Sequence, residues 1–303
     1  MPDRYNKFST YLKTRYGDKV LKVSVDAGFA CPHRGCNDRR EGCIFCRIDS
    51  FAKARPELTV PQQIESGIRL ARERYHIHKY IVYFQASTNT AAPVGVLETL
   101  FEQSIAFEGV VGLAISTRPD CLPPPVLELI GALSQKVDVW VEIGLQSCHD
   151  KTLAFLNRGH TYQDYLAAIG SLKRLNVRLC THLMIGLPNE DRQELMATAD
   201  EMNGSATHEV KLHPLLILKD TPLEQLFMQG QVRELALEEY ASLVGDFIGR
   251  IRPEMVIQRL TAEAPANILL APRWSLNKQA VLRRIEEELI RRNIWQGSLF
   301  EER

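Results

Sequence analysis

The alternation of two kinds of segment constrains the fold of this chain more than any other feature. Six short runs, rich in Val and Ile, are apolar along most of their length. They occupy residues 20–25, 80–84, 110–116, 137–143, 177–184 and 209–213. Strands that are covered on both faces have this continuous apolar character, so each run is predicted to be a strand of a parallel sheet.

Amphipathic segments of helical length separate these runs. They occupy residues 61–75, 94–107, 124–134, 162–175 and 190–202. Strands that alternate with helices form parallel sheets with right-handed crossovers. The sequence therefore predicts an α/β fold, a partial (β/α)6 TIM-like barrel, in which chemistry takes place on the loops after the carboxyl ends of the strands.

The last part of the chain departs from this alternation. It contains a helical segment over residues 235–249, a strand-like run over 256–260 and an amphipathic helix over 277–292. We therefore divide the chain into a basic and aromatic lead-in (1–20), a barrel core (21–235) and a C-terminal helical and strand extension (236–303). The extension is expected to pack on the barrel.

Charge and hydropathy exclude several classes of protein. Thirty-seven basic residues balance thirty-seven acidic ones, which argues against a protein that coats nucleic acid. No apolar run reaches the length of a membrane span, so no membrane partner is predicted. The polar start MPDRYNKF is unlike a signal peptide, and we expect a cytoplasmic protein. Seven cysteines, an odd number, argue against a disulfide framework.

Four of these cysteines crowd into the loop after the first predicted strand. Cys31, Cys43 and Cys46 follow the pattern C-x11-C-x2-C, with Cys36 inside the long interval. Three thiolates can bind three irons of a [4Fe–4S] cubane and leave the fourth iron open for another ligand. A zinc site completed by Cys36 or His33 stays an alternative, as do unligated thiols and a redox-active Cys43/Cys46 pair.

The residues around these cysteines resemble a known family. Cys31-Pro-His-Arg and Glu-Gly-Cys43-Ile-Phe-Cys46 are similar to the YhcC/YtqA-type radical S-adenosylmethionine (SAM) proteins, relatives of the elongator catalytic subunit. The resemblance extends over nearly the whole chain, and only Cys36 is an addition to the pattern. It implies the radical SAM type of barrel, a [4Fe–4S] cluster on Cys31, Cys43 and Cys46, and SAM as second cofactor.

The same resemblance implies SAM contacts at the ends of the strands. Glu142 and His182 have structural alternatives, because a charged residue in an apolar strand needs a partner and a single histidine is often a core residue. Arg158 has one as well, a salt bridge to Glu142. The implied SAM-binding residues are Gln85, Ser87, Thr117, Glu142, Gln146, Arg158, His182, Gly186 and Leu187.

The implied reaction is one-electron cleavage of SAM to a 5′-deoxyadenosyl radical, with electrons from a flavodoxin or ferredoxin-type donor. Kinship with elongator points to tRNA as substrate, at the C5 side chain of the wobble uridine. Basic residues alternate with Tyr5, Phe8, Tyr11 and Tyr16 in the lead-in, where aromatic rings could stack on bases. The alternatives are a radical SAM enzyme that acts on a small molecule or protein, and a zinc-binding, non-catalytic RNA adaptor.

Overall fold

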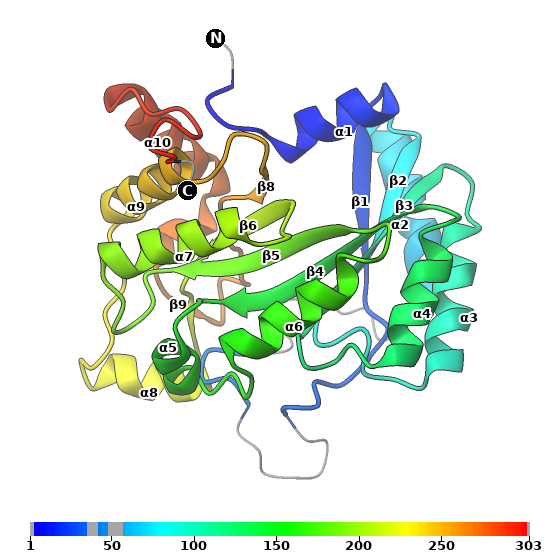
Figure 1. Cartoon of the computed structure of the whole chain (residues 1–303), viewed down its shortest axis with the longest axis horizontal. Coiled ribbons are helices and arrows are strands. Elements are labelled where there is room, and N and C mark those ends of the chain that lie inside the picture. Colours follow the sequence, from blue (N-terminus) through cyan, green and yellow to red (C-terminus); the bar gives the residue numbers. More distant parts are fainter. Residues whose placement is uncertain (1–2, 35–41, 48–56, 302–303) are drawn as a thin grey trace.

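A single curved sheet of parallel strands organises the protein (Figure 1). The computed structural model describes residues 3–34, 42–47 and 57–301. The strand order is β1-β2-β3-β4-β5-β6-β8. The bounds are β1 Val20–Val25, β2 Lys79–Phe84, β3 Val110–Thr117, β4 Asp138–Gln146, β5 Arg178–Ile185, β6 Glu209–Pro214 and β8 Val256–Arg259. All six predicted strands are present, and the predicted partial barrel is confirmed.

Helices cover the outer face of this sheet (Figure 1). They are α2 Val60–Tyr75, α3 Val94–Ile105, α4 Pro124–Leu133, α5 Asp150–Phe155, α6 Tyr162–Leu172, α7 Arg192–Gly204, α8 Pro222–Met228, α9 Leu237–Arg250 and α10 Lys278–Arg291. Thr59, Thr161 and Asp191 each form a capping box that fixes the start of α2, α6 and α7. The apolar core lies between helices and sheet; Phe84 and Phe101, for example, meet edge to face at 4.9 Å.

The strand β8 differs from the sequence-based expectation. We placed residues 256–260 in an extension that packs on the barrel, whereas β8 pairs in parallel with β6 and continues the sheet. Helices α9 and α10, from the same part of the chain, pack against each other beside it. A two-stranded antiparallel sheet, β7 Ile217–Leu218 with β9 Leu269–Ala271, stands apart from the main sheet. The division at residue 235 stays a prediction.

The lead-in forms a helix, α1 (Phe8–Tyr16), that closes one end of the barrel. Leu12 of α1 is buried against Trp140 at the amino-terminal ends of the strands. Just before α1, the amide of Ile257 in β8 donates to the carbonyl of Asn6 at 2.9 Å. The helix thus spans the gap between β8 and β1. Figure 1 shows α1 at the opposite end of the barrel from the loop that follows β1.

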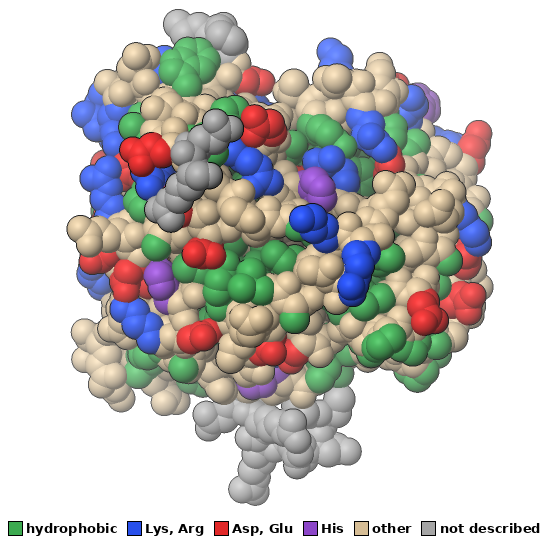
Figure 2. Space-filling view, viewed as in Figure 1, with side chains coloured by type: hydrophobic (Ala, Val, Ile, Leu, Met, Phe, Trp, Pro, Cys, Tyr) green, Lys and Arg blue, Asp and Glu red, His purple; other side chains and the backbone are tan. Residues whose placement is uncertain are grey.

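The surface carries charges of both signs. Figure 2 shows acidic and basic side chains intermingled over one face, with apolar side chains gathered near its centre. Among the described residues, no helix has both the length and the apolar character that crossing a membrane requires.

Candidate active site

A cavity of about 230 Å³ opens at the carboxyl ends of the strands. Its wall brings together ten of the twelve residues that the sequence predicted for cluster and SAM binding. They are Cys31, Cys43, Cys46, Gln85, Ser87, Thr117, Glu142, Gln146, Arg158 and His182. Residues from the ends of β2, β3, β4 and β5, from the segment after α5 and from the cysteine loop thus converge on one space, as expected at this end of a parallel barrel.

The cysteine loop is anchored to neighbouring parts of the chain. The amide of Ile44 donates to the carbonyl of Leu156 at 3.1 Å, and its carbonyl accepts from the amide of Leu223 at 3.0 Å. The side-chain amide of Asn157 donates to Gly42 at 2.6 Å. These bonds tie the loop to the turn after α5 and to the start of α8, so the thiols of Cys43 and Cys46 are held by a fixed backbone.

The three thiols share one electrostatic environment. Burial is the largest of the effects that raise the pKa of Cys46 to about 11; the nearby sulfurs of Cys43 and Cys31 add to it, and the guanidinium groups of Arg34 and Arg158 oppose it. Arg158 also donates a hydrogen bond from Nη1 to Sγ of Cys43 at 3.1 Å. This bond connects the cysteine loop to the segment that follows α5.

The three thiols of the cysteine loop line the same cavity. Among the described residues, the one set of three or more His, Cys, Asp and Glu ligand atoms within 4.8 Å of one another is Glu142, Cys180 and His182. The sulfurs of Cys31, Cys43 and Cys46 therefore do not all lie within 4.8 Å of one another. Cys36 lies outside the described residues.

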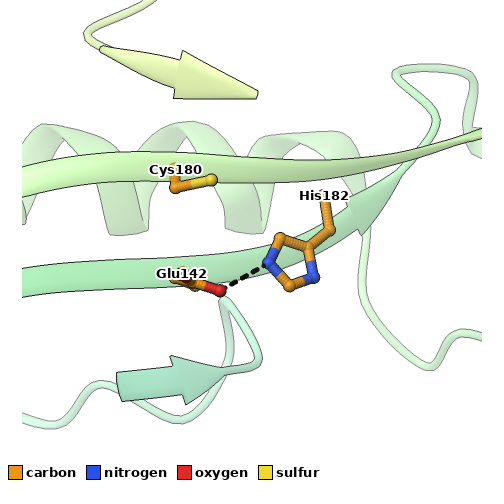
Figure 3. A group of neighbouring side chains, drawn as sticks. All are labelled: Glu142, Cys180 and His182. Carbon is orange, nitrogen blue, oxygen red and sulfur yellow. Dashed lines mark hydrogen bonds and ion pairs between the residues drawn. The ribbon is translucent and has the colours of Figure 1, made fainter. Parts of the chain in front are cut away.

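Figure 3 shows Glu142 and His182 joined by a hydrogen bond, with Cys180 near them. Glu142 accepts from Nζ of Lys22 at 2.6 Å, from Nε2 of His182 at 2.9 Å and from Nζ of Lys211. Burial opposes ionisation of Glu142, but Lys211 and Lys22 hold its pKa well below the usual value. Two ammonium groups on one carboxylate make this place unfavourable for a metal cation.

His182 has a defined protonation state in this arrangement. Burial and then the charge of Lys211 lower its pKa to about 4, while the hydrogen bond to Glu142 opposes this shift. A neutral His182 donates through Nε2 to the ionised Glu142, so Nδ1 carries the free lone pair. Both oxygens of Glu142 already accept hydrogen bonds within the protein. The predicted contacts of Glu142 and His182 with SAM stay predictions.

Three polar atoms in the cavity wall are buried and have no partner. They are Oγ of Ser87, Oγ1 of Thr88 and Nη1 of Arg118. Arg118 otherwise forms an ion pair with Asp120 at 2.9 Å and donates to the carbonyl of Arg158 at 2.8 Å. Unpartnered buried groups cost stability unless a ligand completes them. Hydroxyl and guanidinium donors suit the amino-acid end of SAM, so this wall fits that cofactor.

Backbone strain is concentrated on the same wall. Ala86, Ser87 and Gln146 have φ values of 68°, 56° and 83°, in the left-handed region that side chains avoid. Asn89 holds the loop in this shape, because its Nδ2 donates to the carbonyls of Ala86 at 2.9 Å and Ser116 at 3.2 Å. Strain of this kind collects at binding sites, where surrounding bonds maintain it.

Gly186 and Leu187 do not line the cavity. Gly186 has a φ of 86°, and a Cβ there would lie 2.6 Å from Leu235. Leu187 is buried in an apolar cluster with Cys43 and Phe45, where it supports the cysteine loop from behind. Their direct contact with SAM stays a prediction. Arg158 forms no ion pair with Glu142; it donates to the carbonyl of Gly144 at 2.6 Å as well as to Cys43.

Sequence reasoning did not select Lys22, Lys211 and Thr88 as parts of this site. The signal for the lysines was present, because a lone carboxylate in an apolar strand needs a cation and each lysine lies within a predicted strand. No signal distinguished Thr88, since its unpartnered state depends on the fold around it.

The protein combines a half-barrel, a three-cysteine loop and unpartnered donors on one cavity. This combination is typical of barrel enzymes that bind a metal group and a polar cofactor. The family model of the radical SAM superfamily matches residues 31–202, and that of the radical SAM C-terminal domain matches residues 207–291. The chain belongs to the radical SAM superfamily. Membership implies an enzyme that uses SAM and a [4Fe–4S] cluster.

Within the superfamily, the chain is 38% identical to the uncharacterized protein YtqA of Bacillus subtilis, over 98% of this chain and 93% of YtqA. It is 27% identical to a tRNA uridine(34) acetyltransferase of Methanocaldococcus jannaschii, over 53% of this chain and 30% of that protein. The solved structure of Elp3 from Methanocaldococcus infernus superimposes with a TM-score of 0.72 at 18% identity, covering 91% of this chain and 64% of that one. This last likeness supports the fold.

Proposed function

We propose that Cys31, Cys43 and Cys46 hold the [4Fe–4S] cluster of a radical SAM enzyme and that SAM binds beside them in the same cavity. One observation carries the proposal: the three thiols and the unpartnered atoms of Ser87, Thr88 and Arg118 face one enclosed space. When bound and reduced, such a cluster cleaves SAM to methionine and a 5′-deoxyadenosyl radical.

The residues of the chain orient and protect these groups. Arg158 donates a hydrogen bond to Sγ of Cys43 and helps to orient it. Arg118, whose Nη1 has no partner, is the best-placed donor for the SAM carboxylate, because all three guanidinium nitrogens of Arg158 already donate within the protein. Gln85, Thr117 and Gln146 provide further polar contacts on the same wall.

The electron for this reaction has to come from outside the chain. The superfamily requires a reductant, and the cavity wall offers one set of three cysteine ligands among the described residues. We propose a flavodoxin or ferredoxin-type protein as the donor.

For the substrate we propose tRNA, at the C5 side chain of the wobble uridine. Support comes from the similarity to a tRNA uridine(34) acetyltransferase over 53% of this chain. The basic lead-in that suggested RNA binding gives no support, because Phe8, Tyr11 and Tyr16 pack at the closed end of the barrel.

The second candidate is a radical SAM enzyme that acts on a small molecule or a protein. The chain spans only 30% of the tRNA-modifying relative, so most of that protein has no counterpart in this alignment. The third candidate is a zinc-binding, non-catalytic RNA adaptor, which the metal content of the protein distinguishes from an enzyme.

Anaerobic reconstitution tests the cofactor proposal. The expected product is a brown protein with about four irons and four sulfides per chain, which releases 5′-deoxyadenosine from SAM under reduction. A colourless protein loaded with zinc would overturn the proposal.

The tRNA proposal is tested separately, by mass spectrometry of tRNA nucleosides from a strain that lacks the gene. Loss of a C5-modified wobble uridine is expected. Unchanged wobble nucleosides together with an active cluster would reject tRNA and favour the second candidate.

A further inference from the structure

The half of the cavity that faces away from Ser87 and Arg118 is lined by side chains of a different kind. It is formed by the ends of strands β5, β6 and β8 and by residues of β7 and of the segments beside it. The residues on this half are His182, Met184, His213, Pro214, Leu216, Leu218, Arg259 and Ala262. Most of these side chains are apolar, and Arg259 is the one arginine or lysine among them.

Arg259 is the charged group of this half. It ends β8 and is exposed at the cavity. Within the described ranges, no carboxylate lies within ion-pair distance of Arg259 and no acceptor binds its guanidinium. This contrasts with the neighbouring lysine: in the register of the sheet Arg259 lies opposite Lys211, whose charge is satisfied by Glu142.

The surroundings leave the charge of Arg259 uncompensated. Glu142 is the one carboxylate among the described residues of the cavity wall, and it is shared by Lys22, Lys211 and His182. His213 follows Lys211 by two positions on β6, and its ring lies 5.5 Å from that of His182, centroid to centroid. A neutral imidazole and an unpaired guanidinium at one cavity wall form a set of hydrogen-bond donors for an anion.

The position of Arg259 separates it from the SAM wall. Arg118 follows β3 and Arg259 ends β8, and β4, β5 and β6 lie between them in the sheet. Arg259 therefore faces the cavity from the side that remains for a substrate when SAM occupies the wall with Ser87, Thr88 and Arg118.

We propose that this half of the cavity binds an oxyanion of the substrate, a phosphate or a carboxylate, with Arg259 as its charged anchor and His213 as a neighbouring donor. The inference rests on the proposed radical SAM function and names the chemical class of its substrate. A planar guanidinium binds either oxyanion through two parallel hydrogen bonds.

Calorimetric titration of the reconstituted holoenzyme with SAM present tests this proposal. Inorganic phosphate and acetate serve as separate probes at constant ionic strength, and the variants are Arg259→Gln, Arg259→Lys and Arg283→Gln. Arg283 is the matched control, because it is exposed on α10, away from the cavity. Arg259→Gln is expected to weaken the preferred anion by about tenfold to hundredfold. Arg259→Lys should fall between, and Arg283→Gln should bind like the wild type.

Equal anion affinity in wild type and Arg259→Gln would overturn the proposal, as would failure of both anions to bind. A loss of SAM affinity without a loss of anion affinity would also overturn it, because Arg259 would then bind the cofactor and not the substrate. An anticodon stem-loop RNA is expected to displace bound phosphate; if it does not, the anion belongs to a small molecule. Iron and sulfide content, measured on the same samples, reports separately whether the proposed cofactor function holds.

Discussion

The two ends of this barrel are built from the same strands, but they differ in the hydrogen-bond partners of their polar side chains. At the closed end, Arg15 and Tyr16 of α1 both bind Asp138 at the start of β4, and Trp140 donates to Glu209 at 3.0 Å. At the open end, Ser87, Thr88 and Arg118 have buried polar atoms without partners.

The difference separates stability from function within one fold. At the closed end the aromatic rings are packed and Asp138 and Glu209 are paired, although Oη of Tyr11 is buried without a partner. The open end combines strained backbone with three unpartnered groups on one cavity, which a ligand would complete. Substitutions at the closed end and in the interior should therefore change the free energy of unfolding. Substitutions at the open end should change binding.

Glu142 gives the largest expected effect on stability. Glu142→Gln leaves Lys22 and Lys211 without a counter-charge inside the barrel, and breaking a buried pair in this way costs about 3–5 kcal/mol. Urea unfolding followed by circular dichroism measures the loss. The matched control is Glu102→Gln, because Glu102 pairs with Lys136 at the surface and its loss should cost less than about 1 kcal/mol. Equal losses of stability in the two variants would contradict the account that Glu142 is the buried counter-charge of Lys22 and Lys211.

Leu12 tests whether α1 belongs to the folded barrel. Leu12→Ala removes a side chain that is 3% exposed, and such truncations cost about 2–5 kcal/mol. The exposed neighbour in Lys13→Ala should change the free energy of unfolding by less than about 0.5 kcal/mol. If both variants unfold like the wild type, α1 is a free lead-in and the closed end does not exist as described.

The pH dependence of stability reports on His182. Its pKa falls from an ordinary 6.5 to about 4 on folding, so the unfolded chain binds more protons between these values. Stability should therefore decrease as the pH falls from about 6.5 to about 4, by up to about 1.4 kcal/mol per pH unit for this histidine. His182→Gln, which can still donate to Glu142, should have a shallower slope over this range. The exposed control His78→Gln should keep the wild-type slope; identical slopes in all three proteins would contradict the buried neutral histidine.

Ser87 gives the smallest effect on stability. Its Oγ has no partner, so Ser87→Ala should change the free energy of unfolding by less than about 1 kcal/mol and can raise it. The same change should weaken SAM binding several-fold, as measured by equilibrium dialysis. A clear loss of stability with unchanged SAM affinity would show that the hydroxyl serves the fold.

The strands, and the convergence of three cysteines on one cavity, could be predicted because each depends on local pattern. Continuous Val and Ile runs define β1 to β6, and the spacing of Cys31, Cys43 and Cys46 depends only on the chain order. The wall around Gln85 and Ser87 followed from the rule that parallel strands present their loops at one edge.

The role of the lead-in at the closed end could not be predicted from the sequence in the same way. Aromatic and basic residues alternate in the lead-in, and this pattern suits an RNA-binding segment as well as a helix whose apolar side packs on a barrel. Only the contacts of Phe8 and Leu12 with Trp140 decide between them. Likewise, Arg259 and Lys211 are both cations in strands, and their different roles depend on which of them reaches Glu142.

Iron content and 5′-deoxyadenosine release of Cys43→Ser, measured beside Cys148→Ser after anaerobic reconstitution, test the central claim most directly. Cys148 is half-buried beside Thr198 and does not line the cavity, so its variant should keep about four irons per chain and wild-type release. Cys43→Ser should lose most of its iron and all detectable release. Wild-type iron content and release in Cys43→Ser would contradict the account.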